Sequence, residues 1–152
     1  MAENNLNKMN ALAGVMDRES KTYSFEKTIS MGGEEKTGAF TAKYMGIGAR
    51  LRMGTIRAKL LDGAPIQSID NVTDDIAFMI AYLQVTLVKM PQWFNYDQID
   101  DYDDLRNLYE EVYNFHTAFR EKNENGENAG SSETTTSKTF VESVQRTPIA
   151  NK

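Results

Sequence analysis

The chain has 152 residues, a formal net charge of -5 and no cysteine. A chain of this length holds one domain with its own core and is short for two. The absence of cysteine excludes disulfides, thiolate metal ligands and cysteine nucleophiles, and the negative charge argues against general nucleic-acid binding.

The two ends of the chain differ in composition from its middle. Residues 1–21 are polar and without a clear period, so we predict a flexible arm in which Leu12, Val15 and Met16 dock as a short helical turn. The arm has no apolar stretch of the kind that marks a signal peptide. Residues 123–152 are rich in Asn, Glu, Gly, Ser and Thr, which predicts a disordered polar tail.

The domain between these ends, residues 22–122, is expected to open with a β-hairpin. Polar and apolar residues alternate over TYSFEKTISM and again over AFTAKYM, with Gly32 and Gly33 between the two runs. A period of two predicts strands, and the two glycines supply the positive φ angles of a tight turn.

A basic helix is predicted next, over IGARLRMGTIRAKLLDG. Its apolar and small residues recur every three or four positions, which is the spacing of one helix face. These residues are Ile47, Leu51, Gly54, Ala58 and Leu61. Glycine in mid-helix costs about 1 kcal/mol against alanine, so we expect another backbone to pack closely on Gly54.

An apolar helix is predicted from a cap at Thr73 or Asp74 to Met90, where Pro91 ends it. Apolar side chains cover most of its circumference, which indicates burial on most sides, in the core or at a subunit contact. Its most apolar part, residues 76–90, has 15 residues. A bilayer requires roughly 20, so no membrane association is expected.

The last helix is predicted to start from Asp103 or Asp104 as its cap. Its apolar residues follow the i, i+3, i+4, i+7 spacing of an amphipathic helix. They are Leu105, Leu108, Tyr109, Val112, Phe115 and Phe119. The predicted fold class is therefore mainly α (α+β), with an N-terminal β-hairpin followed by a bundle of about three helices, and disordered tails at both ends.

Charge is divided unevenly along the chain. Residues 36–61 carry six basic residues and no acid, whereas residues 62–111 carry eleven acids against Lys89 and Arg106. Such segments are either solvated and attracted to each other within the fold, or they guide association with a partner. The second interpretation implies binding that weakens as salt is added.

No sequence motif defines a catalytic or metal site. GGEEKTG lacks the glycine that a phosphate loop has before its lysine, and GIGARL lacks the third glycine of a dinucleotide fingerprint. The aspartates of residues 97–104 do not have the glycine and glutamate spacing of an EF-hand. His116 has no recognisable partner and is expected to be structural. We expect no enzymatic activity, no cofactor and no metal.

A corner, MPQWFN, joins the apolar helix to the acidic one. Pro91 stops the first helix, and Trp93 and Phe94 are expected to lock the corner into the core. The alternative is that Trp93, the only tryptophan, is an exposed anchor for a partner.

The order of these elements resembles that of the tail assembly chaperones of long-tailed bacteriophages. The resemblance covers about residues 22–120 and rests on the strand pair YSFEKTISM and GAFTAKYM, the basic helix ending LLDGAP, the apolar helix IAFMIAYLQVTL, the corner, and DDLRNLYEEVYNFHTAF. It implies a non-enzymatic protein that binds the tape measure protein, and in some systems the tail tube protein, in the host cytoplasm during virion assembly.

Two other functions remain open from the sequence. A structural virion component, such as a tail, neck or decoration subunit retained in the particle, would share the ordered domain and the polar tail. A small regulatory or adaptor protein of the host would share the absence of catalytic motifs. The neighbouring genes and the protein content of purified particles distinguish the three.

A partner-binding groove is predicted on the apolar helix and the corner. An amphipathic helix of the client would lie in such a groove. Opposite charges on two faces would also let copies of the chain associate head to tail, so a salt-sensitive homo-oligomer is expected. The predicted contact residues are apolar side chains with two guiding arginines: Ile80, Leu83, Leu87, Trp93, Phe94, Arg50 and Arg57.

Overall fold

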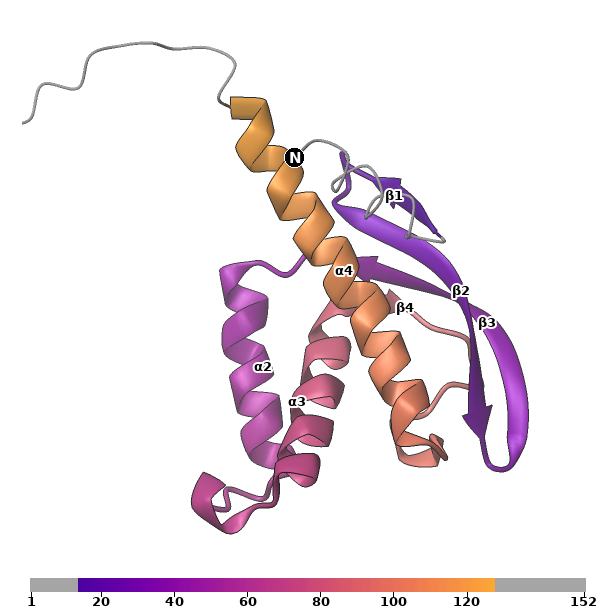
Figure 1. Ribbon diagram of the computed structural model, residues 1–152, viewed down its shortest axis with the longest axis vertical. Coiled ribbons are helices and arrows are strands. Elements are labelled where there is room, and N and C mark those ends of the chain that lie inside the picture. Colours follow the sequence, from indigo (N-terminus) through magenta and orange to yellow (C-terminus); the bar gives the residue numbers. More distant parts are fainter. Residues whose placement is uncertain (1–13, 128–152) are drawn as a thin grey trace, which may run out of the picture.

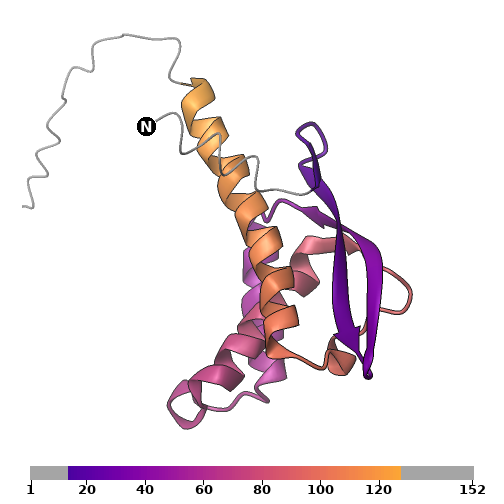
Figure 2. The ribbon, with the colours of Figure 1, turned by 45° about the vertical axis from the view of Figure 1, so that its right-hand side comes forward.

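The computed structural model describes residues 14–127, with side chains as far as residue 121. Within this part of the chain, three α-helices lie on one side of a four-stranded antiparallel sheet (Figures 1 and 2). The strands, in their order across the sheet, are β1 (Val15–Asp17), β2 (Thr22–Met31), β3 (Glu34–Lys43) and β4 (Leu87–Lys89). The helices are α2 (Ile47–Leu60), α3 (Asn71–Thr86) and α4 (Tyr102–Glu127), with single 3₁₀ turns η1 (Ile66–Ser68) and η2 (Tyr96–Gln98).

The predicted fold class is wrong, because the chain forms a sheet with helices and not a helical bundle. The hairpin itself is confirmed as β2 and β3, which turn around Gly32 and Gly33 at φ values of 61° and 81°. These angles lie in the left-handed region that glycine adopts without strain. The predicted disordered tail begins at residue 123, but α4 continues to Glu127, so the first five residues of that tail are helical. Residues 128–152, and residues 1–13 with Leu12, lie outside the described residues.

Two short strands that the sequence pattern did not predict complete the sheet. β1 pairs with β2 inside the predicted arm, where a helical turn was expected. β4 pairs with β3 through Leu87 and Ala42, in a segment that was predicted to be helical. A run of three residues is too short to show a period, so pairing with the hairpin decides its conformation.

The helix α3 ends at Thr86, four residues before the predicted end. The buried hydroxyl of Thr86 donates to the carbonyl oxygen of Tyr82 at 2.8 Å, a local bond that competes with the helical ladder. Pro91 further disfavours helical geometry at Met90. The chain between these points is free to extend as β4.

The core lies between the sheet and α4, with α3 beside it. Alternate residues of β2 and the predicted stripe of α4 supply most of it, each at most 5% exposed. These residues are Tyr23, Phe25, Ile29, Met31, Leu105, Leu108, Val112, Phe115 and Phe119. Aromatic rings connect the layers, since the Phe115 ring of α4 stacks on Tyr23 of β2 at 5.3 Å between centroids.

The helix α2 is the outermost element and packs mainly on α3, which lies between α2 and α4 in Figure 1. None of its residues is buried. The predicted stripe faces solvent, with Ile47 84% and Leu51 72% exposed. A Cβ added at Gly54 would meet no atom within 4 Å, so the close packing expected there does not occur. Met53 and Ile56 form the half-buried side instead.

The acidic turn before α4 fastens the closed end of the hairpin. The Asp100 carboxylate accepts the N–H of Gly33 at 2.6 Å, and the Asp104 carboxylate accepts the N–H of Ser30 at 2.8 Å. Among the residues described, no group of three or more acids or histidines could hold a metal ion. Part of the aspartate cluster therefore serves the fold itself.

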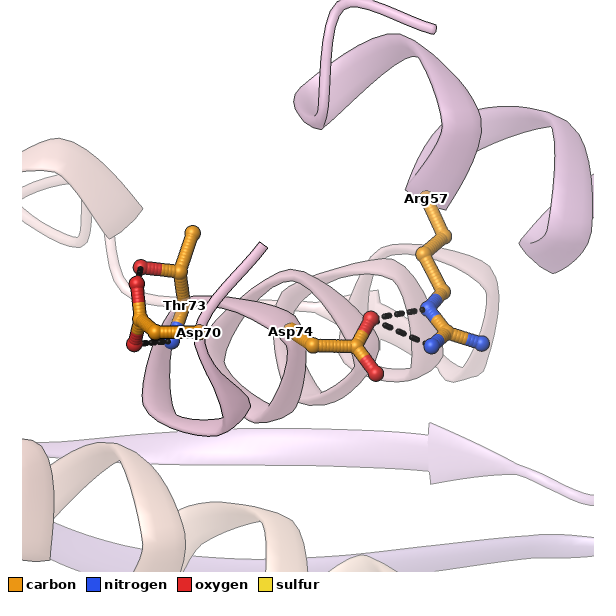
Figure 3. A network of polar contacts seen from close by, with 4 residues as sticks. All are labelled: Arg57, Asp70, Thr73 and Asp74. Carbon is orange, nitrogen blue, oxygen red and sulfur yellow. Dashed lines mark hydrogen bonds and ion pairs between the residues drawn. The ribbon is translucent and has the colours of Figure 1, made fainter. Parts of the chain in front are cut away.

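Both long helices begin earlier than predicted, at caps that lie upstream of the expected ones. The Asp70 carboxylate accepts two hydrogen bonds from Thr73, one from its backbone N–H at 2.9 Å and one from its hydroxyl at 2.6 Å (Figure 3). These bonds to Thr73 hold the pKa of Asp70 below its usual value. At the start of α4 the Asp101 carboxylate accepts the N–H of Asp103 at 2.9 Å. The residues predicted as caps lie in the first turns instead.

Replacing Asp104 by alanine should lower the free energy of unfolding by about 1–2 kcal/mol, because the partly buried N–H of Ser30 loses its acceptor. Asp103→Ala is the matched control, since it removes a carboxylate from the same first turn and costs only the helix-dipole contribution of about 0.5 kcal/mol. Urea unfolding of both variants measures the difference. Equal costs would show that the bond to Ser30 contributes nothing.

Candidate functional site

The predicted groove residues on the apolar helix lie largely inside the domain. Leu83 and Leu87 are 0% and 6% exposed and belong to the core, and Ile80 is half-buried against it. These side chains pack on the sheet and on α4, where they hold the fold together. The folded domain therefore leaves no surface of Leu83 for a partner.

The corner residues pack on the sheet. The rings of Trp93 and Phe94 meet Phe40 edge-on, with centroid distances of 6.4 and 5.2 Å. A Cβ at Gly38 of β3 would lie 2.8 Å from the Trp93 ring and closer still to Pro91. The corner thus fits onto the strand at a position where only glycine leaves room. This geometry favours the structural interpretation of Trp93 over the exposed anchor.

The two predicted guiding arginines have different surroundings. The Arg57 guanidinium makes two hydrogen bonds to one Asp74 oxygen, one of them from Nε at 3.0 Å (Figure 3), and lies 5.8 Å from the centre of the Phe78 ring. It therefore joins α2 to α3. Arg50 is exposed, and among the described side chains it makes no ion pair.

The outward stripe of α2 is the candidate functional site, and we call its residues the outer face. A partner would meet an apolar strip with two large residues in its N-terminal half and two small residues in its C-terminal half, flanked by basic residues. At 100° per residue, Arg50 and Arg57 lie about 70–90° from the middle of the strip and form its border on one side, whereas Arg52 and Lys59 lie further round the helix on the other side, at about 110–130°. The outer face consists of Ile47, Leu51, Gly54 and Ala58.

The helix that carries the outer face has basic residues and no acid. Residues 36–61 contain no acid, and within the described part of the chain Arg57–Asp74 is the single ion pair that joins this basic segment to the acidic one that follows. The two segments are therefore not neutralised by each other. Helical periodicity found these residues, but it could not tell that they face outward.

His116 is a neutral group of the interior. Its Nε2–H donates to the carbonyl oxygen of Lys43 at 3.1 Å, and its Nδ1 accepts a bond from the Tyr82 hydroxyl. Burial lowers the pKa of His116 from 6.5 to about 4. With both nitrogens occupied, the ring ties α4 to α3 and to the end of β3.

No family model, curated protein or solved structure matches the chain. Over residues 14–127, no helix is long and apolar enough to cross a membrane.

Proposed function

We propose that the chain is a non-enzymatic tail assembly chaperone that holds a helical segment of the tape measure protein on the outer face of α2. The observation that carries this proposal is the exposure of Ile47 and Leu51, which lie one helical turn apart and are 84% and 72% exposed. Large apolar side chains gathered on a surface are typical of protein interaction sites. The resemblance in the order of elements supplies the kind of partner.

The shape and charge of the outer face favour an amphipathic helix with acidic flanks. Gly54 and Ala58 keep the C-terminal half of the strip low, so that a second helix can lie close to α2 there. Arg50 on one side of the strip, and the long side chains of Arg52 and Lys59 further round on the other, would pair with Asp or Glu on either side of an apolar seam. A tape measure protein, as the resemblance implies, is a long helical chain that exposes apolar surface before the tube encloses it.

The size of the site suggests how such a chaperone would act. α2 has 14 residues, which corresponds to a length of about 21 Å. One copy therefore covers only a short part of a long client, and several copies must bind along it. An interface of this size is small for a permanent complex, so each copy can leave as tail tube subunits polymerise around the client.

The test is copurification with the tape measure protein encoded in the same genome. Ile47→Ser with Leu51→Ser should weaken binding at least about tenfold, because the apolar seam loses both of its large contacts. Ile66→Ser with Val72→Ser is the matched control, since these residues are also exposed but lie outside the outer face. Binding should also weaken as sodium chloride is raised.

Several outcomes would contradict the proposal. The double variant at residues 47 and 51 could bind the tape measure protein as well as the unchanged chain does. Binding to anionic vesicles alone would identify the outer face as a membrane-surface helix, and self-association that persists without the client would assign it to a second copy of the chain. Stoichiometric amounts of the chain in purified particles would indicate the alternative function, a retained virion component.

A further inference from the structure

A recess lies where the first turn of α2 approaches the later part of α4. Its volume is about 110 Å³, enough for one small functional group and too little for a nucleotide. The residues that line it come from the β3–α2 connection and from all three helices. They are Tyr44, Met45, Arg50, Tyr82, Tyr113, His116, Thr117 and Arg120.

The lining is cationic and offers unoccupied hydrogen-bond donors. Arg50 of α2 and Arg120 of α4 both line the recess, no acid does, and neither guanidinium forms an ion pair among the described side chains. The Tyr82 hydroxyl and the His116 ring are already bonded to each other. The groups left for a ligand are two guanidiniums with the hydroxyls of Tyr44, Tyr113 and Thr117, a set suited to an oxygen anion.

Arg50 belongs to both the recess and the border of the outer face. It lies three residues after Ile47 and directly before Leu51 on α2. If a partner helix docks on the outer face, the side chains next to its apolar seam would therefore lie close to the opening of the recess. This continuity favours a partner docked on the outer face as the source of the anion.

We propose that the recess binds one carboxylate, from an aspartate or glutamate beside the apolar seam of the helix that docks on the outer face. The inference rests on the proposed function. It adds a contact that would fix the position of the client helix along the outer face and would distinguish the client from other helices. The planar guanidinium groups suit the two oxygens of a carboxylate. A neutral side chain at this point of the client would leave both cations unpaired at a covered interface, which disfavours the wrong register.

The first experiment does not depend on the client. In the full chain, the side-chain N–H signals of Arg50 and Arg120 are followed by NMR during titration with sodium acetate, at constant ionic strength set by sodium chloride. Saturable shifts of both signals are expected, and they should disappear in Arg50→Gln and in Arg120→Gln. Lys89→Gln, at an exposed position of β4 outside the recess and the outer face, should leave them unchanged.

The second experiment uses a tape measure fragment that binds the outer face. Each acidic residue of the fragment is replaced by its amide, and one replacement should weaken binding to the unchanged chain about tenfold. The same replacement should have no effect on binding to the Arg50→Gln, Arg120→Gln double variant, as in a double-mutant cycle.

The results separate this inference from the proposed function. Absence of saturable acetate shifts, or equal effects of all amide replacements, would overturn the carboxylate site while binding through Ile47 and Leu51 could still hold. Tighter binding of inorganic phosphate than of acetate, in the same NMR titration, would overturn it in favour of a phosphate ligand. Failure of the serine variants at residues 47 and 51 to change client binding would instead refute the docking face.

Discussion

Replacing Trp93 by alanine should lower the free energy of unfolding by about 3 kcal/mol, the lower end of the range for large aromatic residues, because Trp93 is half-buried. The ring meets Phe40 edge-on and lies over Gly38, so its removal opens a cavity between the corner and β3. The neighbouring Gln92→Ala, at an exposed position of the same corner, should change stability by less than about 0.5 kcal/mol. Urea unfolding, followed by circular dichroism, measures both.

The same contact can be tested from the strand. Gly38→Ala places a methyl group against Pro91 and the Trp93 ring, and overpacking of this kind costs about 1–3 kcal/mol. Both substitutions disturb one contact, so their effects should not add when combined. A Trp93→Ala chain with unchanged stability but lost client binding would establish the exposed-anchor interpretation of the corner.

The parts of the fold that the sequence could predict are those with a clear period. The alternation in β2 and the apolar stripe of α4 were predicted correctly because each element has one buried and one exposed side. The period of the apolar residues therefore indicates both the type of element and the side that is buried. The Gly32–Gly33 turn was predictable because few residues adopt its positive φ angles. β1 and β4 had no such signal, because three residues in a strand are specified by the neighbour they pair with.

The orientation of α2 was not predictable, because two of its faces have helical spacing. Ile47 and Leu51 define one, and Met53 and Ile56 define the other. The choice depends on tertiary contacts with α3, among them the bond between Arg57 and the first turn of α3. When two faces of a helix are similarly apolar, its tertiary contacts decide which of them is buried.

The orientation of α2 also explains why the predicted groove and the candidate site differ. The sequence has an excess of apolar residues at positions 76–90, which predicts an open groove there. In the structure α2 packs on α3, and Leu83 is completely buried. The uncovered apolar surface lies on the opposite side of α2, at Ile47 and Leu51.

The uneven division of charge along the chain also serves the fold in part. Asp100 and Asp104 bind backbone N–H groups of the hairpin, and Asp70 caps α3. These acids are therefore partly used within the domain. The basic border of α2 has fewer internal partners, so electrostatic attraction of a client should depend mainly on Arg50, Arg52 and Lys59.

Acidification from pH 7 to pH 4 should destabilise the folded chain through His116. In the unfolded chain this histidine takes up a proton near pH 6.5, whereas in the folded chain burial lowers its pKa to about 4. Between these values the unfolded state binds more protons than the folded state, so the free energy of unfolding falls as pH falls. A difference of this size corresponds to about 3 kcal/mol, fully lost only below the folded-state pKa.

The surroundings of His116 give the reason for this shift and a control for it. A protonated ring would keep its bond to the Lys43 carbonyl but would lose the one from Tyr82, and it would face Arg50 and Arg120 across the recess. His116→Gln retains a donor for Lys43 and an acceptor for Tyr82 but cannot titrate. Its stability should depend less on pH between 6.5 and 4, and urea unfolding at a series of pH values measures the difference. If both chains lose stability equally over this range, the acid sensitivity belongs to carboxylates shared by the two and not to the buried imidazole.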